Sequence, residues 1–199
     1  MRVRRQPLGG YGGDRGDSSG DVGGVDRSLG AVEGYINTSQ AGDTANTFYG
    51  NSTISSPWIA VAQYCDEVIV EYGANDVFVS LDSVGTIEGH LSGIYALFTL
   101  GQTVKQTTLT PRTVSTDGWT SAVNQTADNG ETVRVSINDA LRAATFGPSG
   151  GHLDLESVLE TSIDSGLWKY NGACRSWTGD GAHPNQCGYL QIQASGEVH

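Results

Sequence analysis

An apolar stretch near the middle of the chain ends in a polar turn. Val68, Ile69 and Val70 are consecutive apolar residues, and positions 73–76 read Gly-Ala-Asn-Asp. A continuous apolar run of this kind is typical of a strand that is covered on both faces, as in a parallel sheet between two layers of helices. The pattern therefore predicts a buried parallel strand with polar groups at its carboxyl end.

Helical patterns flank this strand on both sides. Ser56 followed by Pro57 is typical of a helix start, because proline fits the first helical position. A second strand is predicted at residues 103–109, and residues 111–130 are predicted to form a polar loop. Helices are predicted at residues 57–65, 84–99, 131–144 and 185–194. This alternation favours an α/β layer structure with a parallel sheet, whose ligand site lies at the carboxyl ends of the strands.

The charge balance excludes some partners. The 199 residues contain 11 Lys plus Arg and 22 Asp plus Glu, which gives a formal net charge of -11. Such a surface repels phosphate backbones, so we expect no nucleic acid partner. No apolar run approaches the ~20 residues that a membrane-spanning helix needs, so we expect a soluble protein. The sequence does not indicate an oligomeric state.

Glycine is concentrated at the amino-terminal end. Residues 1–34 hold 10 of the 28 glycines. Glycine loses much conformational entropy when it is ordered. We therefore predict that residues 1–15 form a Gly-rich irregular segment and that residues 16–199 form one catalytic domain. The first residues are basic but lack the apolar segment of a secretory signal, so the compartment stays open, secretion included.

Three short segments carry groups that can act in catalysis. Ser18 lies between small residues, Asn75 follows the predicted buried strand, and Asp180 precedes His183 by three residues. A serine can act as a nucleophile, an amide can donate to an oxyanion, and an acid can orient a histidine base. Each segment alone also has a structural explanation, namely a glycine-rich linker, a turn cap and an exposed histidine. Together they provide the groups that serine hydrolysis needs.

These segments resemble the sequence blocks of the SGNH hydrolases, the GDSL-type esterases and lipases. Gly16-Asp17-Ser18 is similar to the first block and residues 36–42 to the second, while residues 73–76 and 180–183 are similar to the last two. The resemblance implies a flavodoxin-like three-layer sandwich and an ester hydrolase that works through an acyl-enzyme. It implies that Ser18, Asp180 and His183 are catalytic and that Ser18, Gly42 and Asn75 form the oxyanion hole. It implies no cofactor and no metal.

The amino-terminal segment differs from that family pattern. Members run an apolar first strand into the Gly-Asp-Ser block, whereas residues 9–15 of this chain are mostly glycine. We therefore expect the first strand to be degenerate or missing, residues 1 to about 20 to be irregular, and activity to be weakened. No apolar lid for a fatty chain is recognisable, which favours short acyl esters, acetyl above all, of a polar or carbohydrate alcohol.

Other interpretations remain open. Residues 16–20 also fit the Gly-x-Ser-x-Gly elbow of the larger α/β-hydrolases, although that elbow needs a preceding strand. The Gly and Asp density of residues 9–26 suggests instead an impaired domain that acts as a carbohydrate- or calcium-binding module, although it lacks a defined ligand spacing.

Cysteines and tryptophans leave further alternatives. Cys174 and Cys187 bracket the segment from Asp180 to His183 and either form a disulfide bond or stay as thiols. Trp119, Trp168 and Trp177 either stack on sugar rings or pack in the interior. The polar residues Arg112, Asp117 and Asn124 either shape a substrate pocket or belong to a solvated loop.

Overall fold

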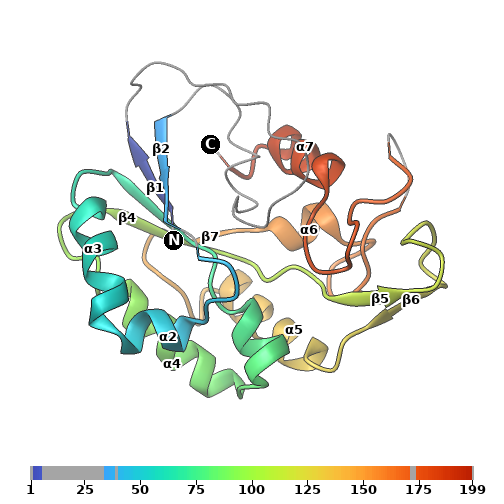
Figure 1. Cartoon of the computed structure of the whole chain (residues 1–199), viewed down its shortest axis with the longest axis horizontal. Coiled ribbons are helices and arrows are strands. Elements are labelled where there is room, and N and C mark those ends of the chain that lie inside the picture. Colours follow the sequence, from blue (N-terminus) through green and yellow to red (C-terminus); the bar gives the residue numbers. More distant parts are fainter. Residues whose placement is uncertain (1, 6–33, 39, 171–173, 199) are drawn as a thin grey trace.

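The computed structural model describes residues 2–5, 34–38, 40–170 and 174–198. A five-stranded sheet in the order β2-β1-β3-β4-β7 forms its centre (Figure 1). Its strands are β1 (Arg2–Arg5), β2 (Gly34–Asn37), β3 (Glu67–Val70), β4 (Thr103–Thr107) and β7 (His152–Leu153). The helices are α2 (Ala45–Gly50), α3 (Ser52–Ala62), η1 (Asp76–Ser80, a π-helix), α4 (Val84–Tyr95), α5 (Glu131–Arg142), α6 (Leu155–Leu159) and α7 (Gln186–Ser195).

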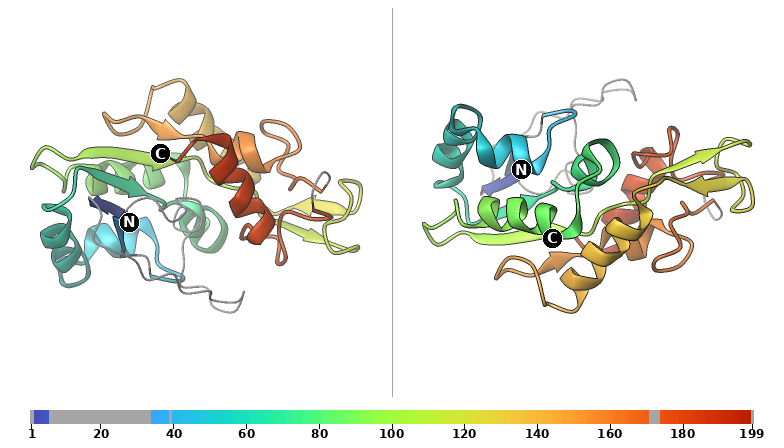
Figure 2. Two further views of the ribbon diagram at one scale, coloured as in Figure 1. Left: turned by 90° about the horizontal axis from the view of Figure 1, so that it is seen from above. Right: turned by 90° about the horizontal axis from the view of Figure 1, so that it is seen from below.

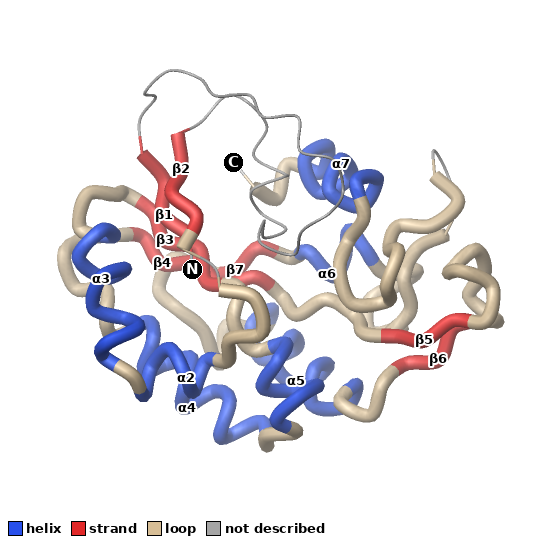
Figure 3. The backbone as a smooth tube through the Cα atoms, viewed as in Figure 1, coloured by secondary structure: helices blue, strands red, loops and turns tan. Residues whose placement is uncertain are grey.

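The sheet separates two apolar cores. Val68 and Val70 of β3 face a core that they share with α2, α3, α4 and α5, while Ile69 between them faces a second core built with α6 and α7. Alternate residues of a strand point to opposite faces of the sheet, so one apolar run fills both cores. Figure 3 shows the strands between these two groups of helices. The predicted α/β layer architecture with a short parallel sheet is confirmed.

The predicted helices form with shifted boundaries. Ile87, Leu91 and Ile94 are buried on one face of α4, as their spacing predicts. The helix expected to start at Pro57 begins at Ser52 instead, because the Asn51 side chain caps it by accepting from the Thr53 N–H. Pro57 therefore lies inside α3, and the predicted start is wrong.

The sheet also contains antiparallel pairs beside the predicted parallel strands. β3, β4 and β7 run parallel to one another, whereas β1 pairs antiparallel with both β2 and β3. The prediction of an irregular amino-terminal end is therefore wrong for Arg2–Arg5, because these residues complete the backbone hydrogen bonds of two neighbouring strands. Arg5 pairs with Gly34 at the start of β2, so the chain leaves β1 at the edge opposite to the carboxyl ends of β3 and β4.

The predicted loop at residues 111–130 contains a hairpin. β5 (Thr113–Ser115) pairs antiparallel with β6 (Gln125–Ala127) in a separate two-stranded sheet. Figure 2 shows this hairpin extending away from the main sheet in both views. The predicted loop is wrong at both strands, because the Asp117 side chain folds the turn between them by accepting from Ser121, Thr120 and Asn124. No described helix is both long and apolar enough to cross a membrane.

Candidate active site

Asp180 and His183 form a hydrogen-bonded pair. Asp180 Oδ2 lies 2.7 Å from His183 Nδ1, and Asp180 Oδ1 accepts the backbone N–H groups of Ala182 and His183, each at 2.8 Å. Burial alone would raise the pKa of Asp180, but these hydrogen bonds from His183 and Ala182 hold it below the ordinary value. The carboxylate is therefore ionised at neutral pH and can fix the imidazole in the tautomer whose Nε2 accepts a proton.

The loop that carries this pair is fixed at Gly181. The Gly181 carbonyl accepts the Thr113 N–H at 2.9 Å and the Trp168 indole N–H at 3.0 Å. Gly181 has a φ of +77°, and a side chain there would clash with the carbonyl oxygen of Thr113 and the ring of Trp119. Only glycine fits this position without strain.

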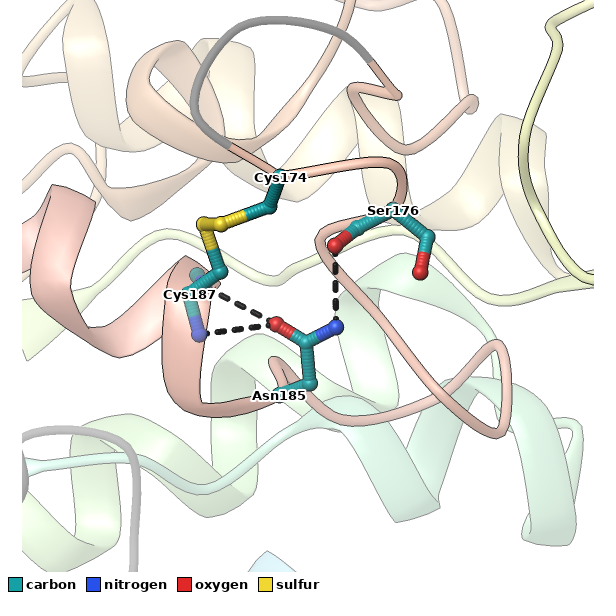
Figure 4. The surroundings of a disulfide bond; sticks show 5 residues. Cys174, Ser176, Asn185 and Cys187 are labelled. Atoms are coloured by element: carbon teal, nitrogen blue, oxygen red, sulfur yellow. Dashed lines mark hydrogen bonds between the residues drawn. A yellow bond between two sulfur atoms is a disulfide. The ribbon is translucent and has the colours of Figure 1, made fainter.

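A disulfide bond and a helix cap close the base of the loop. Cys174 and Cys187 are bonded, with their Cα atoms 6.3 Å apart. Asn185 Oδ1 accepts the N–H groups of Cys187 and Gly188, and its Nδ2 donates to the Ser176 carbonyl at 2.9 Å (Figure 4). The loop from Ser176 to Asn185 is thus closed covalently and by hydrogen bonds. The disulfide alternative of the sequence analysis is confirmed.

Asn75 is oriented by the loop that contains Gly42. The Asn75 Nδ2 donates to the Asp43 carbonyl at 2.8 Å, and the Tyr72 hydroxyl donates to Asp43 Oδ2 at 2.9 Å. Burial, with Asp43 adding to it, raises the pKa of the Tyr72 phenol, so this hydroxyl remains a donor. One hydrogen of the Asn75 amide serves this bond, which aims the other away from Asp43. The orientation of the amide is therefore fixed, which is what a preorganised hydrogen-bond donor requires.

Asp76 fixes the same loop from the other side. The side chain is fully buried, and its two oxygens accept the N–H groups of Ala45 and Asn46 at the start of α2, at 2.9 and 3.3 Å. Gly42 has a φ of +76°, which favours glycine. Gly42 directly precedes Asp43, whose carbonyl accepts the Asn75 amide, so the two predicted residues lie on either side of this contact.

The segment from Thr108 to Thr113 links the two halves of the site. A side chain added at Gly73 would touch Leu109 at 3.1 Å, and Thr113 donates to Gly181. β3 and β4 are parallel neighbours, so this segment follows the same sheet edge at which Asn75 lies. Asn75 thus follows the carboxyl end of β3, and the Asp180–His183 loop is tied through Gly181 to Thr113, which follows the carboxyl end of β4.

A buried ionic network supports this linking segment, and sequence reasoning missed it. Arg134 is fully buried, donates to the Leu109 carbonyl at 2.9 Å, and pairs with Glu131, Glu156 and Glu160. Glu156 also binds Asn138 and Arg142. The helical spacing of Glu131, Arg134 and Asn138 places these polar groups on one face of α5. This polar stripe is the sequence pattern that could have predicted the network.

Other predicted residues have different outcomes. Ser18 lies outside the described residues. Trp168 is fully buried and Trp177 is 9% exposed, so the interior alternative holds for both. Trp119 has a φ of +59° and donates through its indole N–H to Thr113. Arg112 pairs with Asp128, and Asp117 and Asn124 belong to the turn of the β5–β6 hairpin.

One group of side chains has the composition of a metal site. Ligand atoms of Asp76, Asp82 and His90 lie within 4.8 Å of one another. Both oxygens of Asp76 already accept backbone N–H groups of α2. The Asp76 carboxylate therefore already has a structural role, which is to hold the start of α2. None of the contacts around Asn75 or His183 described above requires a metal at this group.

Solved structures of esterases share this fold. An acetyl esterase variant with an acetate ion is 16% identical, with a TM-score of 0.52 over 79% of this chain and 66% of that one. A carbohydrate esterase of family 3 from Talaromyces cellulolyticus is 17% identical, with a TM-score of 0.50 over 78% and 65%. A GDSL-like lipase from Bacteroides thetaiotaomicron is 15% identical, with a TM-score of 0.50 over 77% and 68%.

These similarities define the fold of the chain. It has the three-layer fold of the GDSL-type esterases and lipases, the SGNH hydrolase fold. The chain spans 65–68% of the length of these three structures. No protein-family model and no curated protein matches it. Because one fold hosts many functions, the activity must be argued from the site.

Proposed function

We propose that the protein is a serine ester hydrolase that works through an acyl-enzyme. His183, oriented by Asp180, removes the proton from the Ser18 hydroxyl, and Ser18 attacks the ester carbonyl. The N–H groups of Ser18 and Gly42 and the Asn75 amide hold the oxyanion. The alcohol leaves with the proton from His183, and water then releases the acid by the same steps. No metal or organic cofactor takes part in this scheme.

The Asp180–His183 pair carries the proposal. Asp180 Oδ2 lies 2.7 Å from His183 Nδ1, which orients the imidazole. The side chains of Asp180 and His183 are 56% and 74% exposed, so the imidazole is also accessible. A purely structural histidine is expected to be packed or to bond through both nitrogens. An exposed, oriented base and a fixed amide donor are two of the groups that acyl transfer requires.

The substrate we propose is a short acyl ester, acetyl above all, of a polar or carbohydrate alcohol. Two of the solved structures that share the fold are named as an acetyl esterase and a carbohydrate esterase. The acid–base pair is open to solvent, which suits an alcohol that stays partly hydrated. Acetyl esters should be hydrolysed faster than esters of about ten carbons, a length that marks a deep apolar pocket.

Hydrolysis of an aryl acetate by purified protein tests the activity. Ser18→Ala and His183→Ala should each abolish turnover while the far-UV circular dichroism spectrum stays unchanged. His152→Ala, on β7, is the matched histidine control and should keep the wild-type rate. Turnover that survives His183→Ala would refute the proposed function. A calcium-induced change in near-UV circular dichroism without esterase activity would favour the binding-module alternative.

A further inference from the structure

We propose that Thr178 is a positioning residue that fixes the orientation of the His183 imidazole. The inference rests on the proposed function, since it assigns Thr178 to the same acid–base pair. Thr178 is fully buried beneath the loop, and its hydroxyl makes two short contacts across it. Thr178 Oγ1 accepts the Gly181 N–H at 2.9 Å and donates to the His183 carbonyl at 2.7 Å.

The hydroxyl completes the fixation of the His183 backbone. Asp180 Oδ1 holds the His183 N–H, and Thr178 holds the His183 carbonyl, so both backbone polar groups of the base are bonded within the loop. Thr178 also forms an antiparallel bridge with Pro184, which brings the two ends of the loop together. A single hydroxyl that acts as donor and acceptor thus links the turn at Gly181 to the residue that carries the base.

Because the His183 side chain is exposed, its orientation depends mainly on these polar contacts. The His183 side chain is 74% exposed, so packing contributes little to its orientation. The direction of the ring is therefore set by Asp180 and by the backbone from which the side chain extends. Without the Thr178 hydroxyl, the His183 carbonyl would lose its side-chain partner, and the backbone would be held less firmly. A displacement of ~1 Å at a catalytic group can cost on the order of 100-fold in rate.

Thr178→Val tests this role because it keeps the shape of the side chain and removes the hydroxyl. We expect kcat for an aryl acetate to fall roughly 10-fold to 100-fold with little change in KM, because Thr178 is buried and its hydroxyl acts through His183. Thr178→Ser, which keeps the hydroxyl, should restore kcat to within about 2-fold of wild type. Thr107→Val is the matched control, since Thr107 is also buried and donates to a backbone carbonyl, that of Val70.

Imidazole nitrogen chemical shifts provide a readout that does not depend on turnover. In the wild type, the ¹⁵N shifts of His183 should report one tautomer with the proton on Nδ1, facing Asp180. Thr178→Val should give a mixture of tautomers, whereas Thr178→Ser and Thr107→Val should keep the single form. If Thr178→Val does not fold, Thr178→Cys, a weaker donor, should show the mixture in part.

The two measurements separate this inference from the proposed function. Wild-type kcat and a single tautomer in folded Thr178→Val would overturn the role of Thr178. Equal losses of kcat in Thr178→Val and Thr107→Val, with the tautomer unchanged, would also overturn it and indicate a general stability effect. A wild-type protein without esterase activity would refute the proposed function, while the nitrogen shifts would still decide whether Thr178 orients His183.

Discussion

The proposed acid–base loop and the proposed oxyanion side of the site are held in opposite ways. Asp180 and His183 are three residues apart and bond to each other within one disulfide-closed loop, which Thr113 and Trp168 hold from outside at Gly181. Asn75 is oriented by a hydrogen bond to Asp43, which lies 32 residues away, and Asp43 in turn accepts a hydrogen bond from Tyr72. The acid–base pair is exposed, whereas Asp76 and Tyr72 beside Asn75 are buried. A local motif can thus build half of a site, and the other half requires the whole sheet.

This difference predicts separate responses to mutation. Changes at Asp180 and His183 should affect the rate more than the stability, because both side chains are exposed and belong to neither core. Changes at the buried residues beside Asn75 should lower both the rate and the stability. The following variants test that separation.

Asp180→Asn should have the largest effect. The amide oxygen can still accept the N–H groups of Ala182 and His183, but the amide favours the wrong imidazole tautomer, so kcat should fall roughly 10,000-fold. The melting temperature should change little, since the side chain is 56% exposed. Steady-state kinetics and thermal unfolding check both statements, with the exposed Asp66→Asn as control. A loss below 10-fold would show that Asp180 does not orient the base.

Removal of the disulfide should loosen the acid–base loop. The bond between Cys174 and Cys187 closes 14 residues counting both ends, and chain entropy predicts about 3 kcal/mol of stabilisation for a loop of this size. Replacing both cysteines by serine should lower the free energy of unfolding by about this amount and reduce esterase activity. Reductant should reproduce both effects in the wild type and leave the double variant unchanged. Equal stability of the two proteins would contradict the prediction.

Asn75→Ala tests the oxyanion side. Loss of one preorganised donor should lower kcat ~100-fold or more, equal to about 2.7 kcal/mol. The variant also frees the Asp43 carbonyl, so a small loss of stability should accompany the loss of rate. Tyr72→Phe should weaken the same unit indirectly, with a smaller loss of rate. An unchanged rate in Asn75→Ala would place the oxyanion donor elsewhere.

The features that the sequence predicted correctly are those set by local pattern. The apolar run from Val68 to Val70 predicted a buried strand, and the spacing of Ile87, Leu91 and Ile94 predicted the buried face of α4. The pairing of Asp180 with His183 followed from their separation of three residues. Each of these depends on periodicity or on contacts within a few residues.

The features that it missed depend on distant parts of the chain. β1 is stabilised by the strands on either side of it, β2 and β3, and its short basic sequence carries no strand pattern. The β5–β6 hairpin forms because Asp117 organises a turn from polar residues, which a composition argument assigned to a loop. Tertiary context overrides local propensity in both cases. The position of Ser18 stays a prediction.

The buried ionic network connects the two halves of the site. Arg134 supports the Leu109 carbonyl, and Leu109 precedes the residues that bind Gly181. Glu160 belongs to this network, is nearly fully buried, and accepts the Gly166 N–H at 3.1 Å. Burial raises the pKa of Glu160, Arg134 opposes the rise, and Glu156 adds to it, with a net result of about 8. The direction of this shift favours the protonated form of Glu160.

Glu160→Gln should have the smallest effect on kcat, and it should change how the melting temperature depends on pH. Because the folded-state pKa of Glu160 is raised above that of the unfolded chain, the folded state binds the extra proton, and this stabilisation is complete below about pH 4.5. It is lost as the pH rises through about 8. Between pH 5 and 8.5 the wild-type melting temperature should therefore fall relative to that of Glu160→Gln. Glu88→Gln on α4 is the control and should follow the wild type. Parallel curves for wild type and Glu160→Gln would show that Glu160 is ionised throughout and that Arg134 outweighs burial.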